Sequence, residues 1–226
     1  MKITGKIAVK IIHTILRTIC KVDSTEINKI PLNGPFVVAM NHTNFLEVPM
    51  IFTHLQPRTA VGIVKKETWH KGVTKWLATH WNAIPIDREG LSTDTFKKAR
   101  RVLKDGNFVI IAPEGTRNKT GKLIPGKAGM ISIALRSKVP IIPVAHFGGE
   151  DIYKNLKKLK RTNFKFKVGT PIIFQPQGIV DSEKRKYFTD QVMYRIAELL
   201  PKKYRGVFSE IENLSNDDIL EIKIEH

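Results

Sequence analysis

A histidine and a carboxylate stand close together directly after an apolar run. His42 and Glu47 follow residues 36–40, Phe-Val-Val-Ala-Met, which are typical of a buried strand. An imidazole can take up a proton near neutral pH, and a neighbouring carboxylate fixes its tautomer and stabilises the imidazolium that forms. The pair therefore predicts a general base that activates an alcohol. A second interpretation stays open, because Asn44 and Glu47 also have the spacing of a helix capping box.

Three further apolar runs carry candidate residues. The first, 83–86, leads into Asp87 and Arg88, and the second, 108–112, leads into Pro-Glu-Gly-Thr-Arg at 113–117. The third is Val-Pro-Ile-Ile-Pro-Val at 139–144. Guanidinium groups stay charged and offer planar, paired donors that match phosphate oxygens. Arg88 and Arg117 are thus candidate phosphate ligands, with an ordinary surface or structural ion pair as the alternative for each.

These segments, in this order, resemble the glycerolipid acyltransferases of the 1-acylglycerol-3-phosphate (lysophosphatidate) acyltransferase type. That family shows NHxxxxD, a block that ends in an Asp-Arg or similar pair, PEGTR, and a VPIIPV-like block. The chain departs from the pattern at one position, where Glu47 replaces the family's aspartate. Glutamate is one methylene longer, so its carboxylate reaches an imidazole nitrogen if the backbone or rotamer adjusts. The departure also leaves a catalytically silent, lipid-binding relative as an alternative.

The resemblance implies transfer of a fatty acyl group from a thioester to the free hydroxyl of lysophosphatidate, which gives phosphatidate. His42 is then the base and Glu47 its orienting partner, and another lyso-lipid is the alternative acceptor. No GxSxG pattern indicates a nucleophile, so an acyl-enzyme is not required. Acyl-CoA or acyl-acyl carrier protein is expected as co-substrate, with no bound cofactor. No CxxC or HExxH spacing indicates a metal.

The resemblance also assigns the remaining site residues. Arg117 is expected to hold the acceptor's phosphate, and Glu114 either bonds its glycerol or braces Arg117. Gly115 either lets the backbone approach the ligand or makes a tight turn. The expected substrate-binding set is Arg88, Glu114, Gly115, Thr116 and Arg117. The wall of the acyl-chain slot is expected at Val139, Pro140, Ile141, Ile142 and Pro143, for which a plain buried strand is the competing interpretation.

Composition limits the class of protein. With 226 residues and 42% hydrophobic side chains the chain fits one folded domain, and its single cysteine, Cys20, permits no internal disulfide. The net charge of +17 suits nucleic acid, an anionic lipid surface or an acidic protein such as acyl carrier protein. A nucleic-acid module is disfavoured because zinc spacing, RNP-like aromatics and a helix-turn-helix signal are absent from the sequence. The charge favours a lipid surface only together with the resemblance.

The first residues predict an amphipathic helix. Lys6, Lys10 and Arg17 interrupt any signal-peptide core, and no uncharged stretch approaches the roughly 20 residues of a membrane span. Over residues 3–22 the apolar side chains recur at helical spacing, at Ile7, Ala8, Ile11, Ile12, Ile15, Leu16, Ile19 and Cys20. Such a helix either packs on its own domain or lies in a bilayer interface. The resemblance favours the second, a monotopic anchor at the cytoplasmic face of the cell membrane.

Strand and helix patterns alternate along the chain. Strands are expected at 36–40, 60–64, 83–86, 108–112, 141–144 and 164–168, and helices at 49–54, 67–79, 92–105, 129–136 and 183–200. This order predicts an α/β fold with a mostly parallel central sheet flanked by helices. We divide the chain into a membrane-associating helical segment (1–30), an acyltransferase α/β domain (31–208) and an acidic, peripheral tail (209–226). Catalytic groups are expected on loops that leave the strand ends.

Overall fold

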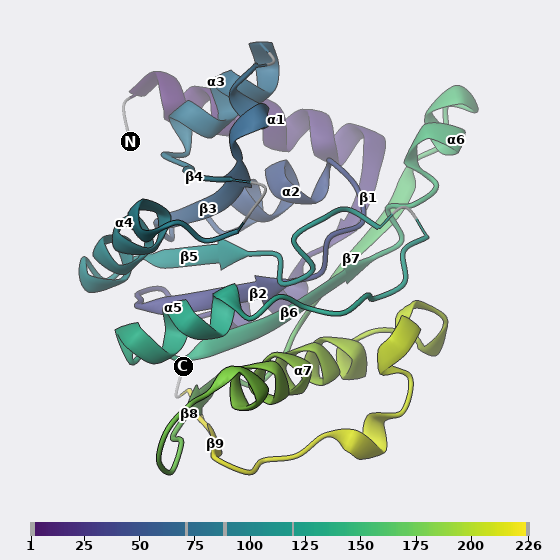
Figure 1. The fold of residues 1–226 in the computed structure, drawn as a ribbon. Coiled ribbons are helices and arrows are strands. Elements are labelled where there is room, and N and C mark those ends of the chain that lie inside the picture. The colour runs from purple at the N-terminus through teal and green to yellow at the C-terminus, as the bar shows by residue number, and fades with distance from the viewer. Residues whose placement is uncertain (1–2, 71, 88–89, 119, 225–226) are drawn as a thin grey trace.

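A central sheet organises the computed structural model, which describes residues 3–70, 72–87, 90–118 and 120–224 (Figure 1). Nine strands join this sheet within those ranges. They are β1 (Cys20–Asp23), β2 (Phe36–Met40), β3 (Ala60–Lys65), β4 (Ile84–Ile86), β5 (Phe108–Ile111), β6 (Ile141–Phe147), β7 (Thr162–Val168), β8 (Ile172–Phe174) and β9 (Ile219–Glu221). The helices are α1 (Ile3–Ile19), α2 (Glu47–His54), α3 (Gly72–His80), α4 (Thr93–Lys104), α5 (Gly129–Ser137), α6 (Ile152–Lys157) and α7 (Ser182–Leu199).

The sheet is mostly parallel, as predicted. Its order is β1-β7-β6-β2-β5-β3-β4, and the pairs β2–β5, β2–β6, β3–β5, β3–β4 and β1–β7 are parallel. β7 runs antiparallel to β6, and β8 pairs with the start of β6 and with β9. Parallel neighbours need long crossover connections, which the helices supply.

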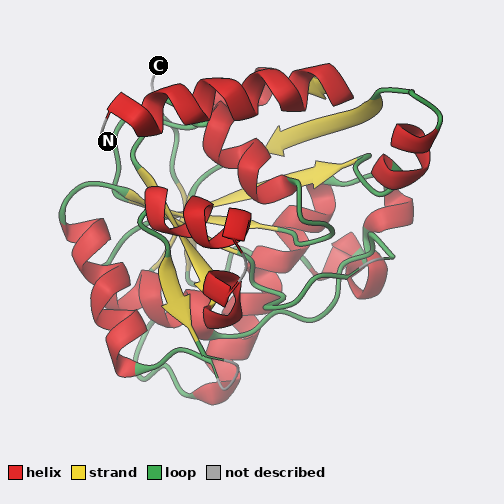
Figure 2. Cartoon of the chain, turned by 90° about the horizontal axis from the view of Figure 1, so that it is seen from above, coloured by secondary structure: helices red, strands yellow, loops and turns green. Residues whose placement is uncertain are grey.

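Helices cover both faces of the sheet (Figure 2). On one face α4, α5 and α7 pack against alternate strand residues such as Val37 and Ala39, and on the other face α1 and α2 pack against Val38 and Met40. Burial on both faces explains why β2 and β5 are continuous apolar runs in the sequence. It also leaves the strand ends as the places where polar side chains can gather.

All six predicted strands and four of these five predicted helices are present, with ends that shift by a few residues. The predicted helix 67–79 instead corresponds to a 3₁₀ helix at Lys66–His70 and α3 at Gly72–His80. Pro49 lies in the first turn of α2, as expected. Ser92 caps α4, and its hydroxyl accepts the N–H of Thr95 at 3.2 Å. Gly106, with a φ of 76°, follows the end of that helix. Local signals therefore place these ends correctly.

Three short strands were not predicted, and two expectations are corrected. Cys20 is the buried first residue of β1 and does not lie on a helical face. The segment from 209 is not peripheral, because its residues Ile219–Glu221 pair with β8. Arg195 of α7 also donates to the carbonyl of Ser215 at 3.1 Å and to the side chain of Asn216. The acidic segment is thus part of the fold.

The N-terminal helix packs only part of its apolar stripe. Val9 and Leu16 are buried, whereas Ile7, Ile11 and Ile15 are more than half exposed. Among the described residues, no helix combines the length and apolar character that crossing a membrane would need. The helix thus packs on its own domain and still presents an apolar row to solvent.

Candidate active site

The carboxyl ends of β2, β5 and β6 meet at one edge of the sheet. β2 lies between the other two strands and is parallel to both, with Ala39 opposite Ile111 and Met40 opposite Val144. His42 follows β2, Glu114 follows β5, and His146 lies near the end of β6. Three titratable side chains from distant parts of the sequence are thereby brought together. Such an edge is where α/β sheets commonly bind ligands.

Glu47 makes the contacts that each sequence interpretation expects, with the imidazole of His42 and with the backbone of its own loop. One carboxylate oxygen, Oε1, contacts Nδ1 of His42. The other, Oε2, accepts the backbone N–H of Thr43 at 2.9 Å and that of Asn44 at 3.0 Å. Glu47 is the first residue of α2 and is 1% exposed. The carboxylate therefore caps the loop and meets the imidazole at once, so the longer side chain does reach His42.

This contact fixes the proton on the imidazole. Hydrogen bonds from N–H donors favour the ionised form of the Glu47 carboxylate, which can only accept, so Nδ1 of His42 carries the proton and Nε2 keeps its lone pair. None of the described residues hydrogen-bonds with that Nε2. Burial, and then the positive charge of Arg117, lower the pKa of His42 to about 3. The side chain, 23% exposed, is thus a neutral base open to a ligand.

Glu114 holds the backbone of His42. Its Oε1 accepts the N–H of His42 at 2.7 Å, and the backbone of Ile124 also hydrogen-bonds with it. Burial raises the pKa of Glu114 to about 7, against the lowering effect of those two bonds. The side chain is 2% exposed and engaged with backbone. This differs from both expected roles, a bond to the glycerol and a brace for Arg117.

The residues after Glu114 turn past His42. Gly115 has a φ of 64°, and a Cβ there would stand 3.1 Å from the side chain of Lys127, so this position is a tight turn. Thr116 and Arg117 follow and are exposed. The N–H of Asn118 donates to the carbonyl of His42 at 2.9 Å. The loop thus brings Arg117 to the same edge as the base.

Arg117 is available for an anion. No carboxylate in the described ranges forms an ion pair with it, and its charge acts on His42 together with that of Lys65. Arg88, the second predicted phosphate ligand, lies outside the described residues. The phosphate-binding roles of both arginines stay predictions.

The expected acyl-chain wall lies in the core. Ile141 and Ile142 are fully buried in β6, one on each face of the sheet, and Val139 and Pro143 are buried as well, with Pro140 just before the strand. Ile141 is in register with Val37, at the end of β2 away from His42. Ile141, Ile142 and Pro143 thus belong to a plain buried strand, as in the alternative interpretation, and Val139 and Pro140 precede it. A core strand and a slot wall have the same apolar pattern.

Sequence reasoning missed His146. This residue is fully buried, and its Nε2 lies 2.9 Å from Oε2 of Glu47 and 2.8 Å from the carbonyl of Asn41. The backbone N–H of His146 donates to Oδ1 of Asn41 at 2.8 Å, and Nδ2 of Asn41 donates to the backbone carbonyl of His146 at 2.9 Å. The signal that could have revealed it is its place two residues after the 139–144 run, which matches that of His42 after β2.

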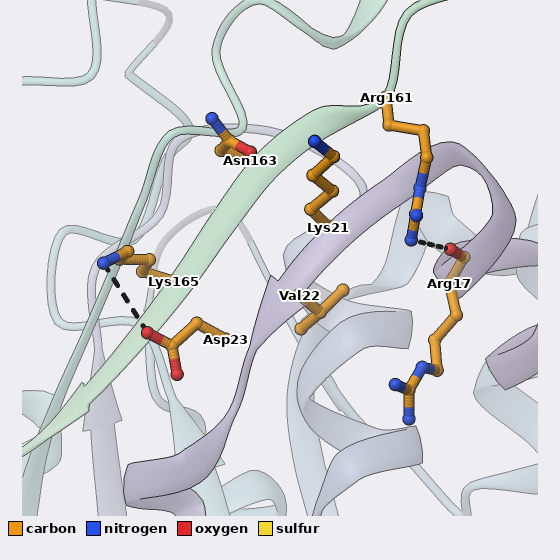
Figure 3. A pocket seen from close by; sticks show the side chains of 7 residues that line it. All are labelled: Arg17, Lys21, Val22, Asp23, Arg161, Asn163 and Lys165. Carbon is orange, nitrogen blue, oxygen red and sulfur yellow. Dashed lines mark hydrogen bonds and ion pairs between the residues drawn. The ribbon is translucent and has the colours of Figure 1, made fainter.

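Two cavities in the described part of the chain lie away from His42 and Glu47. One, of about 480 Å³, lies at the edge strand β1 and its neighbour β7, beside the end of α1 (Figure 3). It is lined by Arg17, Lys21, Val22, Asp23, Arg161, Asn163 and Lys165. The other, of about 500 Å³, lies between α3 and α4. In the described ranges, no three His, Cys, Asp or Glu side chains are grouped as for a metal ion.

The comparisons with known proteins point to one family. Residues 21–146, more than half of the chain, match the family model described as Acyltransferase. The 1-acyl-sn-glycerol-3-phosphate acyltransferase of Bacillus subtilis is 30% identical over 177 residues, which cover 75% of this chain and 83% of the relative. That of Cocos nucifera is 31% identical over 185 residues, which cover 79% and 58%.

A solved structure is similar as well. The crystal structure of the 1-acyl-sn-glycerophosphate (LPA) acyltransferase PlsC of Thermotoga maritima has a TM-score of 0.60 at 23% identity, and the match covers 86% of this chain and 79% of that one. At this identity the likeness shows the fold. The family follows from the sequence comparisons: the chain belongs to the acyltransferases of the 1-acyl-sn-glycerol-3-phosphate acyltransferase family.

Proposed function

We propose that this protein transfers a fatty acyl group from a thioester to the free hydroxyl of 1-acylglycerol-3-phosphate and so forms phosphatidate. The observation that carries the proposal is the His42–Glu47 pair, whose geometry leaves Nε2 of a neutral imidazole open at the ligand-binding edge of the sheet. The relatives named above carry this activity in their names. Together, site and kinship favour this acceptor over another lyso-lipid.

In the proposed reaction His42 acts as a general base. Its Nε2 takes the proton of the acceptor hydroxyl while the oxygen attacks the thioester carbonyl. A C–O bond forms, the C–S bond breaks, and the proton passes to the leaving thiolate. Glu47 stabilises the imidazolium that exists between these two transfers. General-base help of this kind contributes roughly 10²- to 10⁴-fold in rate.

Arg117 supplies the binding of the acceptor's phosphate in this proposal. Its exposed guanidinium follows the turn at Gly115 and acts electrostatically on His42. Paired N–H donors suit a phosphate monoester. The binding loop therefore holds the phosphate while the base faces the hydroxyl.

We further propose that α1 holds the enzyme on an anionic bilayer at the cytoplasmic face of the membrane. The exposed row of Ile7, Ile11 and Ile15 could enter the apolar layer. The cations Arg17, in the last turn of the helix, and Lys21, in β1, are seen in Figure 3 and would meet headgroups, each worth about 1 kcal/mol near an anionic surface. The basic body also suits either donor, since coenzyme A and acyl carrier protein are both acidic.

A reconstituted assay tests the proposal. Purified protein is incubated with labelled lysophosphatidate in two arms, one with acyl-CoA and one with acyl-acyl carrier protein. Lysophosphatidylcholine replaces the acceptor in parallel reactions. We expect phosphatidate in at least one donor arm and little acylation of the zwitterionic acceptor. No phosphatidate with either donor refutes the activity, and preferred acylation of lysophosphatidylcholine refutes the acceptor.

A further inference from the structure

We propose that His146 is a positioning residue that holds the Glu47 carboxylate in the orientation His42 needs. The inference rests on the proposed function, in which His42 is the base. Glu47 Oε2 lies 2.9 Å from Nε2 of His146, while its Oε1 contacts Nδ1 of His42. One carboxylate thus bridges two imidazoles, of which only His42 is accessible. His146 does not touch the reacting groups and acts through Glu47.

The surroundings of His146 fix its tautomer. Its Nε2 faces the Glu47 carboxylate and the carbonyl of Asn41, at 2.9 and 2.8 Å, and both groups only accept hydrogen bonds. The proton must therefore be on Nε2. Nδ1 has no hydrogen-bond partner, which suits a bare lone pair. Burial, the largest influence, lowers the pKa of His146 to about 4, so the ring is a neutral, one-sided donor.

Neighbouring elements hold His146 in place. It stacks on Phe164 of β7, with centroids 5.2 Å apart and planes at 4°. Two hydrogen bonds between the His146 backbone and the Asn41 side chain tie β6 to the residue that precedes His42. His146 thereby fixes the position from which the catalytic loop starts as well as the carboxylate within it.

The close contact with His146 of β6 gives Glu47 an anchor outside its own loop. The hydrogen bonds to Oε2 come from the backbone N–H groups of Thr43 and Asn44 and from the Thr43 hydroxyl, which belong to the loop that carries Glu47 and move with it. Glutamate has one more side-chain torsion than aspartate, so a loop-bound carboxylate has more freedom to turn from His42. Among the described residues, His146, whose Nε2 lies 2.9 Å from Oε2, is the contact between this carboxylate and the sheet. The anchor compensates for the longer side chain.

A pair of substitutions separates the donor from the packing. His146→Phe keeps a ring that can stack on Phe164 but has no donor, whereas His146→Gln keeps an N–H near the position of Nε2. A hydrogen bond to a charged group of this kind corresponds to about a 10- to 100-fold change. We expect His146→Phe to lose about that much in kcat, with KM for lysophosphatidate within about twofold, and His146→Gln to recover most of it. His80→Phe, on α3, is the matched control and should change neither.

Three outcomes decide the kinetic test. Wild-type kcat in His146→Phe, alongside a strong loss in His42→Ala, overturns this inference and leaves the proposed function standing. Equal losses in the Phe and Gln variants, both folded, also overturn it, because packing would then explain the effect. Full activity of His42→Ala overturns the proposed function and this inference together.

A measurement on the wild-type protein covers the case in which His146→Phe does not fold. In protein with ¹⁵N-labelled histidine, NMR shifts at pH 7 report which ring nitrogens carry protons. We expect His146 with the proton on Nε2 and His42 with the proton on Nδ1. A doubly protonated His146, or a proton on its Nδ1, overturns the inference.

Discussion

Replacing Glu47 by glutamine removes one charge and almost nothing of the shape. The backbone N–H groups of Thr43 and Asn44 donate to Oε2, and Nε2 of His146 lies 2.9 Å from it. The amide must therefore place its oxygen there, since its NH₂ group would oppose these donors. The NH₂ group is then left facing Nδ1 of His42, the position that Oε1 occupies in the wild-type protein.

That orientation reverses the tautomer of the base. An NH₂ group donates, so Nδ1 of His42 has to accept, and the imidazole proton moves to Nε2, the nitrogen that should take the substrate's proton. In serine proteases the same carboxylate-to-amide change costs about 10⁴-fold. Because only the minor tautomer is reactive here too, we expect Glu47→Gln to lose about 10³-fold in kcat, or about 4 kcal/mol of barrier.

The assay is steady-state phosphatidate formation over a range of lysophosphatidate concentrations. KM should stay within about threefold, because Glu47 is buried and does not meet the acceptor. Glu47→Asp is the matched control, which keeps the charge and should be faster than the amide variant. A Glu47→Gln enzyme with kcat within tenfold of the wild type would refute the reasoning on the tautomer.

Three further predictions concern the binding loop, the buried acid and the membrane helix. Arg117→Ala should raise KM for lysophosphatidate about 10- to 100-fold with little change in kcat, whereas the exposed Arg100→Ala on α4 should not; an unchanged KM contradicts the phosphate role. Because the folded pKa of Glu114 is raised from 4.5 to about 7, the native state binds more protons between these values. The free energy of unfolding should therefore fall as pH rises from about 4.5 to 7, by about 3 kcal/mol relative to Glu114→Gln. Denaturant titrations at several pH values measure it, and the same pH dependence in both proteins contradicts this prediction. Ile11→Ser should weaken sedimentation with anionic vesicles several-fold, while the equally apolar but remote Ile179→Ser should not, and equal effects would exclude α1 as the contact.

Local patterns in the sequence predicted the elements that carry the site. β2 and β5 are buried on both faces, so each is an unbroken apolar run that ends where His42 and the 113–117 loop begin. Parallel strands put such ends at one edge, which brings the two motifs together without any knowledge of contacts. The roles of Ser92 as a cap and of Gly106 at a helix end likewise depend only on residues a few positions away, so the local sequence predicts them.

Contacts between distant residues could not be predicted in this way. The pair Asn41 and His146 lies 105 positions apart, and a histidine inside an apolar run has no local pattern that names its partner. β1 continues directly from α1, and its strand form depends on pairing with β7. The segment 139–144 shows the opposite failure, since its apolar pattern suits a slot wall and a core strand equally, and only packing on both faces decides.

The most direct test of the account is the single-turnover rate of phosphatidate formation in His42→Ala, beside the wild type and His80→Ala. Binding of lysophosphatidate to the same samples is measured at equilibrium. We predict a loss of roughly 10²- to 10⁴-fold in rate for His42→Ala, with the dissociation constant and the His80→Ala rate nearly unchanged. A His42→Ala rate within threefold of the wild type would contradict the account.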